Sequence, residues 1–459
     1  MTDRTIILRG GHVYQNGSLL DSDLLIRGER IAAILRPDTE IPADEVVDVS
    51  GLAVLPGAID THTHTREPGY EHKEDFASAT RAAAVGGVTT IVDMPNVEPP
   101  TDTVERFLEK REMASGRCMV DWGHWAAGTK PEEIRGLAEA GATGYKIFQV
   151  SGAYPHDPRL AINEEGALIA SFREIAATGL PCLVHPFNQP IFDRLSQEAF
   201  DAGKRPTGRL FSWIYTTDQV WSTAVQTLLK LQELTGVRLH LLHTHSAGSL
   251  RAIRRAKRAG ASVTAEVDPK YYHFTLRQLE EKGARMVPGG FVTEDEERME
   301  EIWRSLNDGT IDNVSTDHAP HLLEEVAVAE EDAWNANLGS PQIEWLYPVV
   351  LTDVAAEHHS LSTAVRLLAE NPARLLGVWP RKGVLRPGSD ADIAVIDLEQ
   401  RFTVDESHVQ SKVGWSPYAG LELQGRVIQT FSRGEKVAEK GKPVGSPGHG
   451  RYIPGRPQD

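Results

Sequence analysis

The sequence has only two cysteines in 459 residues, Cys118 and Cys182. Two cysteines cannot build the disulfide framework of a small secreted protein, and they are too few for a zinc site made of thiolates. The first residues, MTDRTIILRG, lack the charged segment followed by an apolar segment that marks a secretory signal. These observations fit a reducing compartment, and we expect a cytoplasmic protein.

Basic residues and long apolar runs are also scarce. Lysine and arginine number 48 against 65 aspartate and glutamate residues, which gives a formal net charge of −17 at pH 7. This balance disfavours a nucleic-acid surface, which needs a basic stripe, and it disfavours binding to anionic membranes. No apolar run approaches the roughly 18 residues that a membrane-spanning helix requires. We expect a small molecule as the partner, and a few local cations would suffice to bind an anionic one.

Short apolar runs alternate with helical stretches through the middle of the chain. Eight runs predict strands, over residues 58–60, 88–93, 118–122, 143–148, 181–186, 237–243, 262–267 and 311–317. Stretches rich in Ala, Glu, Leu and Arg predict helices between several of them, over 76–85, 131–140, 167–177 and 246–259. This alternation implies parallel strands with helical crossovers, and eight such units predict an α/β fold of the (β/α)8 barrel type. An open doubly wound sheet is the alternative, but it normally carries a glycine-rich turn where this chain has histidines.

Both ends of the chain predict short strands in hairpins. Residues 5–14 predict one strand, and strands over 24–26 and 31–35 flank a Gly-Glu turn. A similar hairpin spans 427–439 around Arg433-Gly434-Glu435. One β domain built from both ends explains the likeness, and a chance sharing of one turn is the alternative. The predicted divisions are a β-sandwich part over 1–55, the barrel over 56–380, a second sandwich part over 381–440 and an arm over 441–459.

Two segments exceed what a minimal barrel requires. Residues 188–218 follow the fifth predicted strand and are long enough to form part of a substrate lid or a subunit contact. Residues 441–459 are rich in glycine and proline, and we expect an extended arm there.

Histidines gather at the ends of the predicted strands. His62 and His64 lie in DTHTH at the end of the first strand, and alternate residues of a strand face the same side. Such a pair suits one metal ion but also occurs by chance. His185 ends the fifth strand, His243 the sixth and Asp317 the eighth. Because barrel enzymes hold catalytic residues at this rim, the five groups predict a site for a divalent metal such as zinc.

The sixth strand offers three histidines, His240, His243 and His245. Parity puts His243 on one face with Leu239 and Leu241, and it puts His240 on the other face. His245 lies beyond the strand. We therefore choose His243 as the ligand and expect His240 behind the barrel.

Lys146 ends the fourth predicted strand in GATGYKIF. A lysine that faces a cationic site is disfavoured by burial and by like charge. A side chain that turns outward to solvent fits the residues equally well, and spacing cannot reveal a chemical modification.

The chain resembles the cyclic amidohydrolases of the amidohydrolase superfamily, the group of dihydroorotases, allantoinases and hydantoinases. The resembling stretches run nearly end to end, and they are PGAIDTHTHTREPGYEHKEDF, AAAVGGVTTIVDMPN, GATGYKIF, LHLLHTHSAGSL, STDHAPH and NPARLLGVWPRKGVLRPGSDADIAVID. The resemblance implies a TIM barrel with a composite β-sandwich domain from the N- and C-terminal segments. It also implies a homodimer or homotetramer, in which the arm could embrace a neighbour.

The same resemblance implies two divalent metal ions, usually zinc. By position, His62 and His64 would bind the more buried metal together with Asp317, and His185 and His243 would bind the other. Lys146 would be carbamylated to N6-carboxylysine and would bridge both metals. A carbamate removes the positive charge and supplies two anionic oxygens, which answers the electrostatic objection to a lysine.

The implied chemistry is hydrolysis of a cyclic amide. Two metals a few ångströms apart can hold a hydroxide and polarise a ring carbonyl. In the family, the aspartate that matches Asp317 takes the proton and passes it to the leaving ring nitrogen, which is general acid–base catalysis. The ring opens to a carbamoyl acid, and the reverse cyclisation is equally catalysed.

The substrate is less clearly indicated than the chemistry. Arg66, Asn96 and His321 resemble the dihydroorotase residues that hold the substrate's carboxylate, and a guanidinium suits bidentate carboxylate binding. The alternatives are a salt bridge from Arg66 to Glu67 or Glu71 and a turn at Asn96. We expect a carboxylated cyclic ureide or imide, with dihydroorotate and N-carbamoyl-aspartate as the specific pair.

Other positions depart from the dihydroorotase pattern. Residues 288–291 are PGGF instead of a PPLR-like segment, and 266–274 are EVDPKYYHF instead of a Glu-x-x-Pro-His-His-like stretch. His185-Pro186-Phe187 replaces the common His-Ala-Glu, and VDWGHWAAG over 120–128 resembles the allantoinases and hydantoinases. The alternative is therefore an allantoinase- or hydantoinase/dihydropyrimidinase-like hydrolase of an uncharged ring. A non-enzymatic scaffold is a remote alternative, because such relatives have lost the ligands that this chain keeps.

Overall fold

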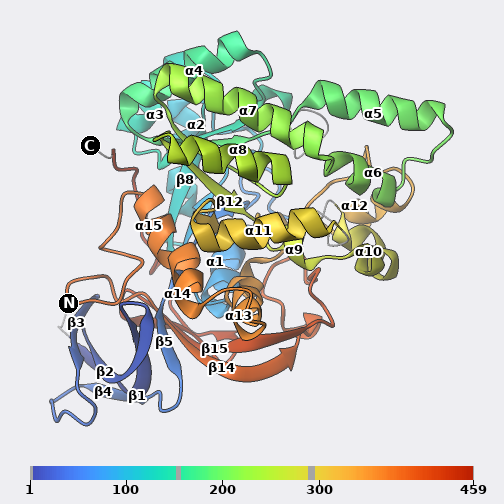
Figure 1. Ribbon diagram of the computed structural model, residues 1–459. Helices are drawn as coiled ribbons and strands as arrows, with labels where there is room; N and C mark the ends of the chain where they lie inside the picture. The colour runs from blue at the N-terminus through green and yellow to red at the C-terminus, as the bar shows by residue number, and fades with distance from the viewer. Residues whose placement is uncertain (1–3, 151–156, 288–294, 458–459) are drawn as a thin grey trace.

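Eight parallel strands form a nearly closed barrel in this computed structural model, which describes residues 4–150, 157–287 and 295–457 (Figure 1). The strands are neighbours in chain order, and a parallel bridge from Thr63 to His318 joins the first strand to the chain after the last. They are β6 (Ala58–Thr63), β7 (Val88–Asp93), β8 (Asp121–Ala127), β9 (Gly144–Phe148), β10 (Pro181–His185), β11 (Arg238–Leu241), β12 (Val263–Val267) and β13 (Asn313–Val314). The predicted (β/α)8 barrel is confirmed.

Several of the predicted strands have the wrong bounds. The first runs to Thr63 and not to Asp60, and the sixth covers only 238–241 of the predicted 237–243. The third begins at Asp121 and runs to Ala127, not over 118–122. Cys118 is buried in an apolar cluster outside any strand, and its carbonyl accepts hydrogen bonds from Gly448 and Gly450. The eighth strand is regular only over 313–314, and the segment 288–291 lies outside the described residues.

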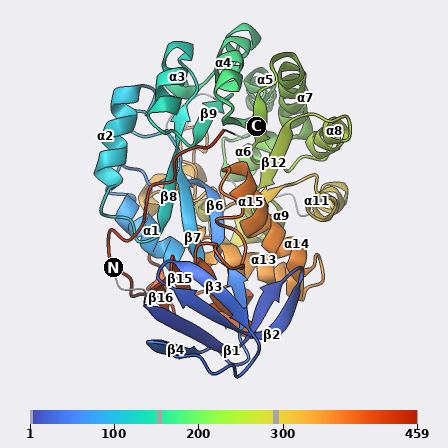
Figure 2. The same cartoon turned by 90° about the vertical axis from the view of Figure 1, so that its left-hand side faces the viewer.

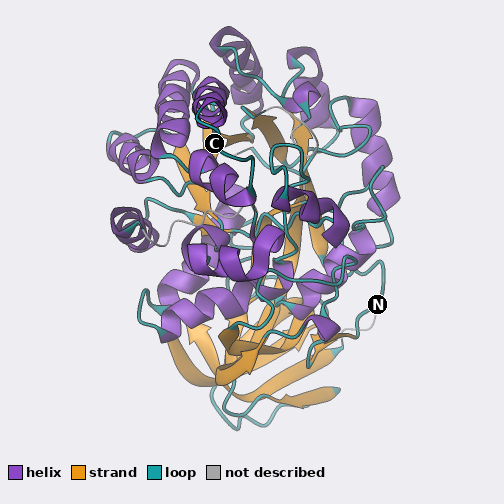
Figure 3. Ribbon diagram, turned by 90° about the vertical axis from the view of Figure 1, so that its right-hand side faces the viewer, coloured by secondary structure: helices purple, strands orange, loops and turns teal. Residues whose placement is uncertain are grey.

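Helices cover the outside of the barrel (Figure 3). The four predicted helices are present as α1 (Phe76–Val85), α3 (Pro131–Glu139), α4 (Glu165–Thr178) and α8 (Ala247–Arg258). The others are α2 (Val104–Ala114), α5 (Gln189–Asp201), α6 (Gly208–Tyr215), α7 (Asp218–Thr235), α9 (Lys270–His273), α10 (Leu276–Lys282), α11 (Glu296–Asp308), α12 (Leu323–Ala327), α13 (Leu346–Ala355), α14 (Leu361–Val365) and α15 (Asn371–Leu375). Among the described residues, no helix combines the length and apolar character needed to cross a bilayer.

A second sheet lies below the barrel and joins the two ends of the chain (Figure 2). Its two halves meet where β14 pairs antiparallel with β5, so that Ile393 lies opposite Pro56. The strands from the N-terminal end are β1 (Thr5–Gln15), β2 (Ser18–Arg27), β3 (Arg30–Leu35), β4 (Glu45–Asp48) and β5 (Ala53–Pro56). Those from the C-terminal end are β14 (Ile393–Thr403), β15 (Glu422–Ser432), β16 (Glu435–Glu439) and β17 (Lys442–Pro443). The two similar hairpins therefore belong to one composite domain.

The tail segment, residues 444–457, packs on its own barrel. Tyr452 forms a parallel bridge with Trp122 at the start of β8, and Ile453 donates its backbone N–H to the Trp122 carbonyl at 2.7 Å. The Ile453 side chain is 2% exposed and packs with apolar residues inside the barrel. The tail segment thus closes the end of the barrel opposite the strand ends that carry the histidines.

Candidate active site

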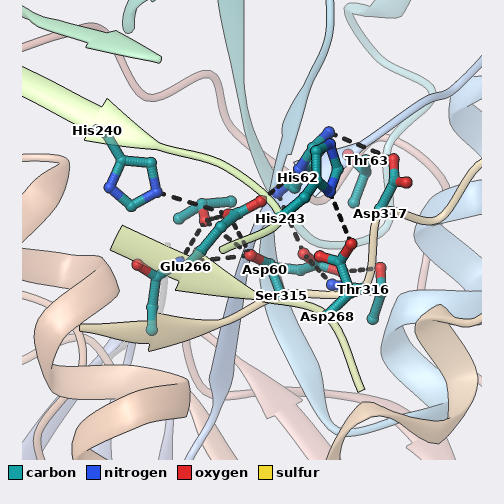
Figure 4. Close-up of polar contacts among 12 residues, drawn as sticks. Asp60, His62, Thr63, His240, His243, Glu266, Asp268, Ser315, Thr316 and Asp317 are labelled. Carbon is teal, nitrogen blue, oxygen red and sulfur yellow. Dashed lines mark hydrogen bonds and ion pairs between the residues drawn. The ribbon is translucent and has the colours of Figure 1, made fainter. Parts of the chain in front are cut away.

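The predicted ligands meet at the carboxyl ends of the barrel strands, and Figure 4 shows His62, His243 and Asp317 among them. Nε2 of His62 lies 3.3 Å from Asp317 Oδ1, and Nε2 of His64 lies 3.1 Å from the same oxygen. The ring centroids of His243 lie 4.8 Å from those of His62 and 4.6 Å from those of His185. All five residues line one pocket. The structure therefore brings together the four histidines and the carboxylate that the sequence singled out.

Lys146 lies on β9 and is fully buried. The outward orientation is therefore wrong. Its Nζ has no hydrogen-bond partner among the described residues, although Glu266, Asp317 and Asp268 act on its charge. Burial lowers the pKa of Lys146 to about 7. A buried ammonium without a partner is costly, and a carbamate at this position would remove that cost.

Three of the four histidines are oriented by an oxygen acceptor on the side away from the pocket. In each pair the Nδ1 hydrogen is donated, which leaves Nε2 directed to the site. The pairs are His62 with Glu266 (2.5 Å), His64 with Asn96 (2.8 Å) and His243 with Asp268 (2.7 Å). Such outer contacts are typical of histidines that bind metals. No sequence motif assigned this role to the three acceptors, since contacts between residues far apart in the chain leave no local pattern.

Burial holds two imidazoles of this site, those of His64 and His243, in the neutral form. Burial lowers the pKa of His64 to about 3 against the hydrogen bond of Asp317, and the charge of Arg66 adds to the lowering. Burial likewise lowers the pKa of His243 to about 3. Neutral imidazole is the form that coordinates a metal ion, so these two histidines can bind one without first losing a proton.

His240 lies inside the barrel, which corrects the parity argument. Its Nδ1 lies 2.8 Å from Thr264 Oγ1, and its Nε2 lies 3.6 Å from the interior carboxylate of Glu266 (Figure 4). Leu239 and Leu241 face the helices instead. The strand ends at Leu241, so alternation no longer applies at His243.

Backbone conformation turns three side chains at the strand ends. His243 has φ 55°, Asp317 has φ 47° and Arg66 has φ 64°, all in the left-handed region. Each such residue costs of order 1–3 kcal/mol, and this strain clusters at functional sites. The positive φ explains why counting residues along the strand did not place His243.

Two of the three predicted substrate residues, Arg66 and His321, contact each other, and Asn96 contacts His64. Arg66 donates from Nε to the carbonyl of Pro320 at 3.0 Å, and its Nη2 lies 3.0 Å from Nε2 of His321. Lys73 Nζ lies 3.3 Å from Nδ1 of His321, which is fully buried. Burial and the charge of Arg66 hold the pKa of His321 well below its usual range. Arg66 and Asn96 line the pocket, and Glu67 pairs with Arg117.

Two further side chains reach the pocket from segments to which the sequence assigned no site residue. Lys270, the first residue of α9, places Nζ 2.5 Å from Asp317 Oδ2. Tyr215 ends α6, and its hydroxyl lies 3.3 Å from His185 Nε2. Residues 188–218 therefore form part of the pocket wall.

The donor set fits divalent metal ions. Ligand atoms of two groups lie within 4.8 Å of one another, the first with His62, His64 and Asp317 and the second with His62, His243, Glu266 and Asp268. Imidazole nitrogens with carboxylate oxygens suit zinc and its neighbours, and they do not suit soft metals that need thiolates.

Comparisons with known proteins agree with this site. The amidohydrolase family matches residues 53–437. An L-hydantoinase of Paenarthrobacter aurescens is 31% identical over 454 residues, which cover 98% of this chain and 97% of the relative. An allantoinase of Streptomyces avermitilis is 33% identical over 447 residues, which cover 96% and 97% of the two chains. A dihydroorotase of Syntrophus aciditrophicus is 33% identical over 453 residues, which cover 95% and 99%.

A solved structure of an L-hydantoinase from Arthrobacter aurescens has a similar fold. Its TM-score is 0.92 at 31% identity, and the match covers 99% of this chain and all of that one. The similarity includes the barrel and the composite sheet, because nearly every residue is matched. The chain therefore belongs to the amidohydrolase family, and within it to the cyclic amidohydrolases, which hydrolyse cyclic amides.

Proposed function

We propose that this enzyme opens a five-membered cyclic ureide of the hydantoin or allantoin type. The observation that carries the choice against a dihydroorotate-type carboxylate is the internal pairing of Arg66 with Pro320 and His321. Asn96 likewise gives its side-chain oxygen to His64. A dihydroorotate carboxylate would have to compete with these contacts, and the low pKa of His321 deprives it of one cation. The hydantoinase and allantoinase relatives support the same choice.

We propose two zinc ions as the cofactors. His62, His64 and Asp317 would hold one, and His185 and His243 would hold the other, with Lys146 carbamylated between them. The neutral imidazoles and the unpaired Lys146 nitrogen support this assignment. Bound there, the metals would polarise the ring carbonyl and lower the pKa of water.

The chain's own groups would handle the proton. Asp317 would accept the proton of the attacking water at its carboxylate and return it to the ring nitrogen that leaves. The C–N bond of the ring breaks, and the product is a carbamoyl-substituted acid or amide-acid. Phe148, Tyr215 and Leu338 line the pocket and would exclude bulk water from the ring.

A substrate panel tests this proposal. The zinc-loaded enzyme is assayed for kcat/KM with hydantoin, allantoin, dihydrouracil and dihydroorotate, with Asp317→Asn as the inactive reference. We expect a higher kcat/KM for hydantoin or allantoin than for dihydroorotate. We also expect Asp317→Asn to lower kcat by about 10²–10⁴-fold. Opening of none of the four rings by the zinc-loaded enzyme would overturn the proposal.

Dihydroorotate is the second candidate substrate. The observation in its favour is that Arg66 and Asn96 line the pocket. A preference for dihydroorotate over both hydantoin and allantoin would establish it and would mean that the Arg66–His321 contact opens on binding.

A further inference from the structure

Lys270 is a cation at the carboxyl end of the seventh barrel strand. It follows β12 by three residues and lies where the dihydroorotase-like pattern has a histidine. The side chain is nearly fully buried and lines the same pocket as His62, His243 and Asp317. A lysine is seldom buried without a paired charge, so its partners indicate what holds it there.

Two carboxylates pair with this ammonium group. Nζ lies 2.5 Å from Asp317 Oδ2 and 3.5 Å from Asp268 Oδ2. Asp268 already accepts the Nδ1 hydrogen of His243, so its charge serves two donors. An ammonium group has three N–H donors; Asp317 accepts one of them, and Asp268 lies at ion-pair distance. One donor is therefore left for a ligand in the pocket.

The pocket holds a second fixed cation and an apolar wall. Arg66 lines it, and its charge contributes to the lowered pKa of His64. The charge of Lys270 likewise lowers the pKa of His243. Burial lowers this pKa more strongly, and the negative charge of Asp317 raises it. Any divalent ion on Asp317 would draw that carboxylate's charge away from Lys270 and make the pocket more positive. An anion on the substrate would restore the balance.

We propose that Lys270 is a specificity-determining residue. It selects hydantoin rings whose substituent at C5 carries a carboxylate. This inference rests on the proposed ring-opening function and names its substrate class, hydantoins with an acidic side chain. Lys270 would donate its third hydrogen to the substrate carboxylate, while Asp268 and Asp317 keep the ammonium group in position. The selection differs from the expected dihydroorotase arrangement, because it depends on Lys270 and not on Arg66, Asn96 and His321.

The test compares two ligands that differ only in charge. 5-(Carboxymethyl)hydantoin and its primary amide are assayed with the zinc-loaded wild type, Lys270→Gln and Lys270→Arg, and with Lys230→Gln on the exposed surface of α7 as control. A charge-assisted hydrogen bond of about 1.5–3 kcal/mol corresponds to about 10–100-fold. We expect the acid-to-amide ratio of kcat/KM to fall by that factor in Lys270→Gln, to be partly kept in Lys270→Arg and to be unchanged in Lys230→Gln.

A binding measurement separates specificity from a purely structural role. Calorimetry measures the affinity of the acid and of its amide for each variant, and zinc content and thermal melting show that each variant is folded and loaded. Equal losses for acid and amide would overturn the proposal and assign Lys270 to positioning Asp317. If the wild type opens neither ring, the proposed function fails, and the acid-to-amide binding ratio still decides the role of Lys270.

Discussion

Asp268 Oδ2 accepts the Nδ1 hydrogen of His243 at 2.7 Å and lies 3.5 Å from Lys270 Nζ. One carboxylate oxygen therefore orients a proposed metal ligand and balances the pocket cation. His62 and His64 have comparable acceptors in Glu266 and Asn96. The metal centre consequently depends on residues that would never touch the metal.

Replacing Asp268 should weaken metal binding. We expect Asp268→Ala to lower zinc affinity by about 10–100-fold, the usual cost of losing an outer contact to a ligating histidine. Asp268→Asn should lose less, because its amide oxygen can still accept from His243. Competition with a chromogenic chelator measures the affinity, and Glu233→Gln on the exposed face of α7 is the control. Unchanged zinc affinity in Asp268→Ala would contradict the orienting role.

Replacing Lys146 should remove the bridge between the metals. We expect Lys146→Ala to lower zinc affinity by more than about 100-fold, which exceeds the loss expected for Asp268→Ala. We also expect this variant to lose its ring-opening activity. A small added carboxylic acid should restore part of both, since it can fill the space of the buried side chain. Labelled bicarbonate should give a carbamate carbon signal by NMR in the wild type. Absence of that signal, with normal zinc content in Lys146→Ala, would contradict the bridging role.

Glu344 should make stability depend on pH. Its carboxylate accepts from the backbone of Gln410 and Ser411, and burial raises its pKa to about 8. Between pH 4.5 and 8 the folded chain keeps a proton that the unfolded chain has lost, so the free energy of unfolding falls as pH rises. The shift sets a ceiling of about 5 kcal/mol on this loss, reached above pH 8.

Glu344→Gln isolates the contribution of this group. The variant cannot ionise there, so its stability relative to the wild type should increase from pH 5 to pH 9. Urea unfolding of both proteins across this range measures the difference. A difference that is constant with pH would contradict the raised pKa.

The tail segment should stabilise the barrel. Ile453 packs inside it at 2% exposure, and Ile453→Ala should lower the free energy of unfolding by about 2–5 kcal/mol. Val444, in the same segment, is 51% exposed. Val444→Ala should change the free energy of unfolding by less than about 0.5 kcal/mol. Urea unfolding separates the two, and equal losses would contradict this packing. Light scattering of both variants tests whether the segment also serves a subunit contact.

Much of the fold could be predicted because parallel barrel strands are buried on both faces. They appear in the sequence as short continuous apolar runs, as over 88–93 and 181–185. The third strand was misplaced because Cys118 is buried without belonging to a strand, and its carbonyl pairs with Gly448 and Gly450, more than 300 residues later. No local pattern reports such a contact.

The site could be predicted where the strand geometry is regular. His62 lies within β6 and His64 directly after it, so alternation placed both correctly. It failed for His240 and His243, because β11 ends at Leu241 and the chain turns with a positive φ. The contacts of Asn96 and Lys270 depend on residues from other strands, which only the folded chain brings together.

The contact between the tail segment and β8 has a consequence for biosynthesis. Arg451 donates its backbone N–H to Asp121, which lies 330 positions earlier in the chain. A ribosome adds about 5–20 residues per second, so about 16–66 s separate the appearance of these two partners. Throughout that interval the growing chain leaves Trp122 without the cover that Tyr452 later gives it. This end of the barrel therefore closes only after residues 451–453 have been synthesised, and shorter nascent chains leave Trp122 without this cover.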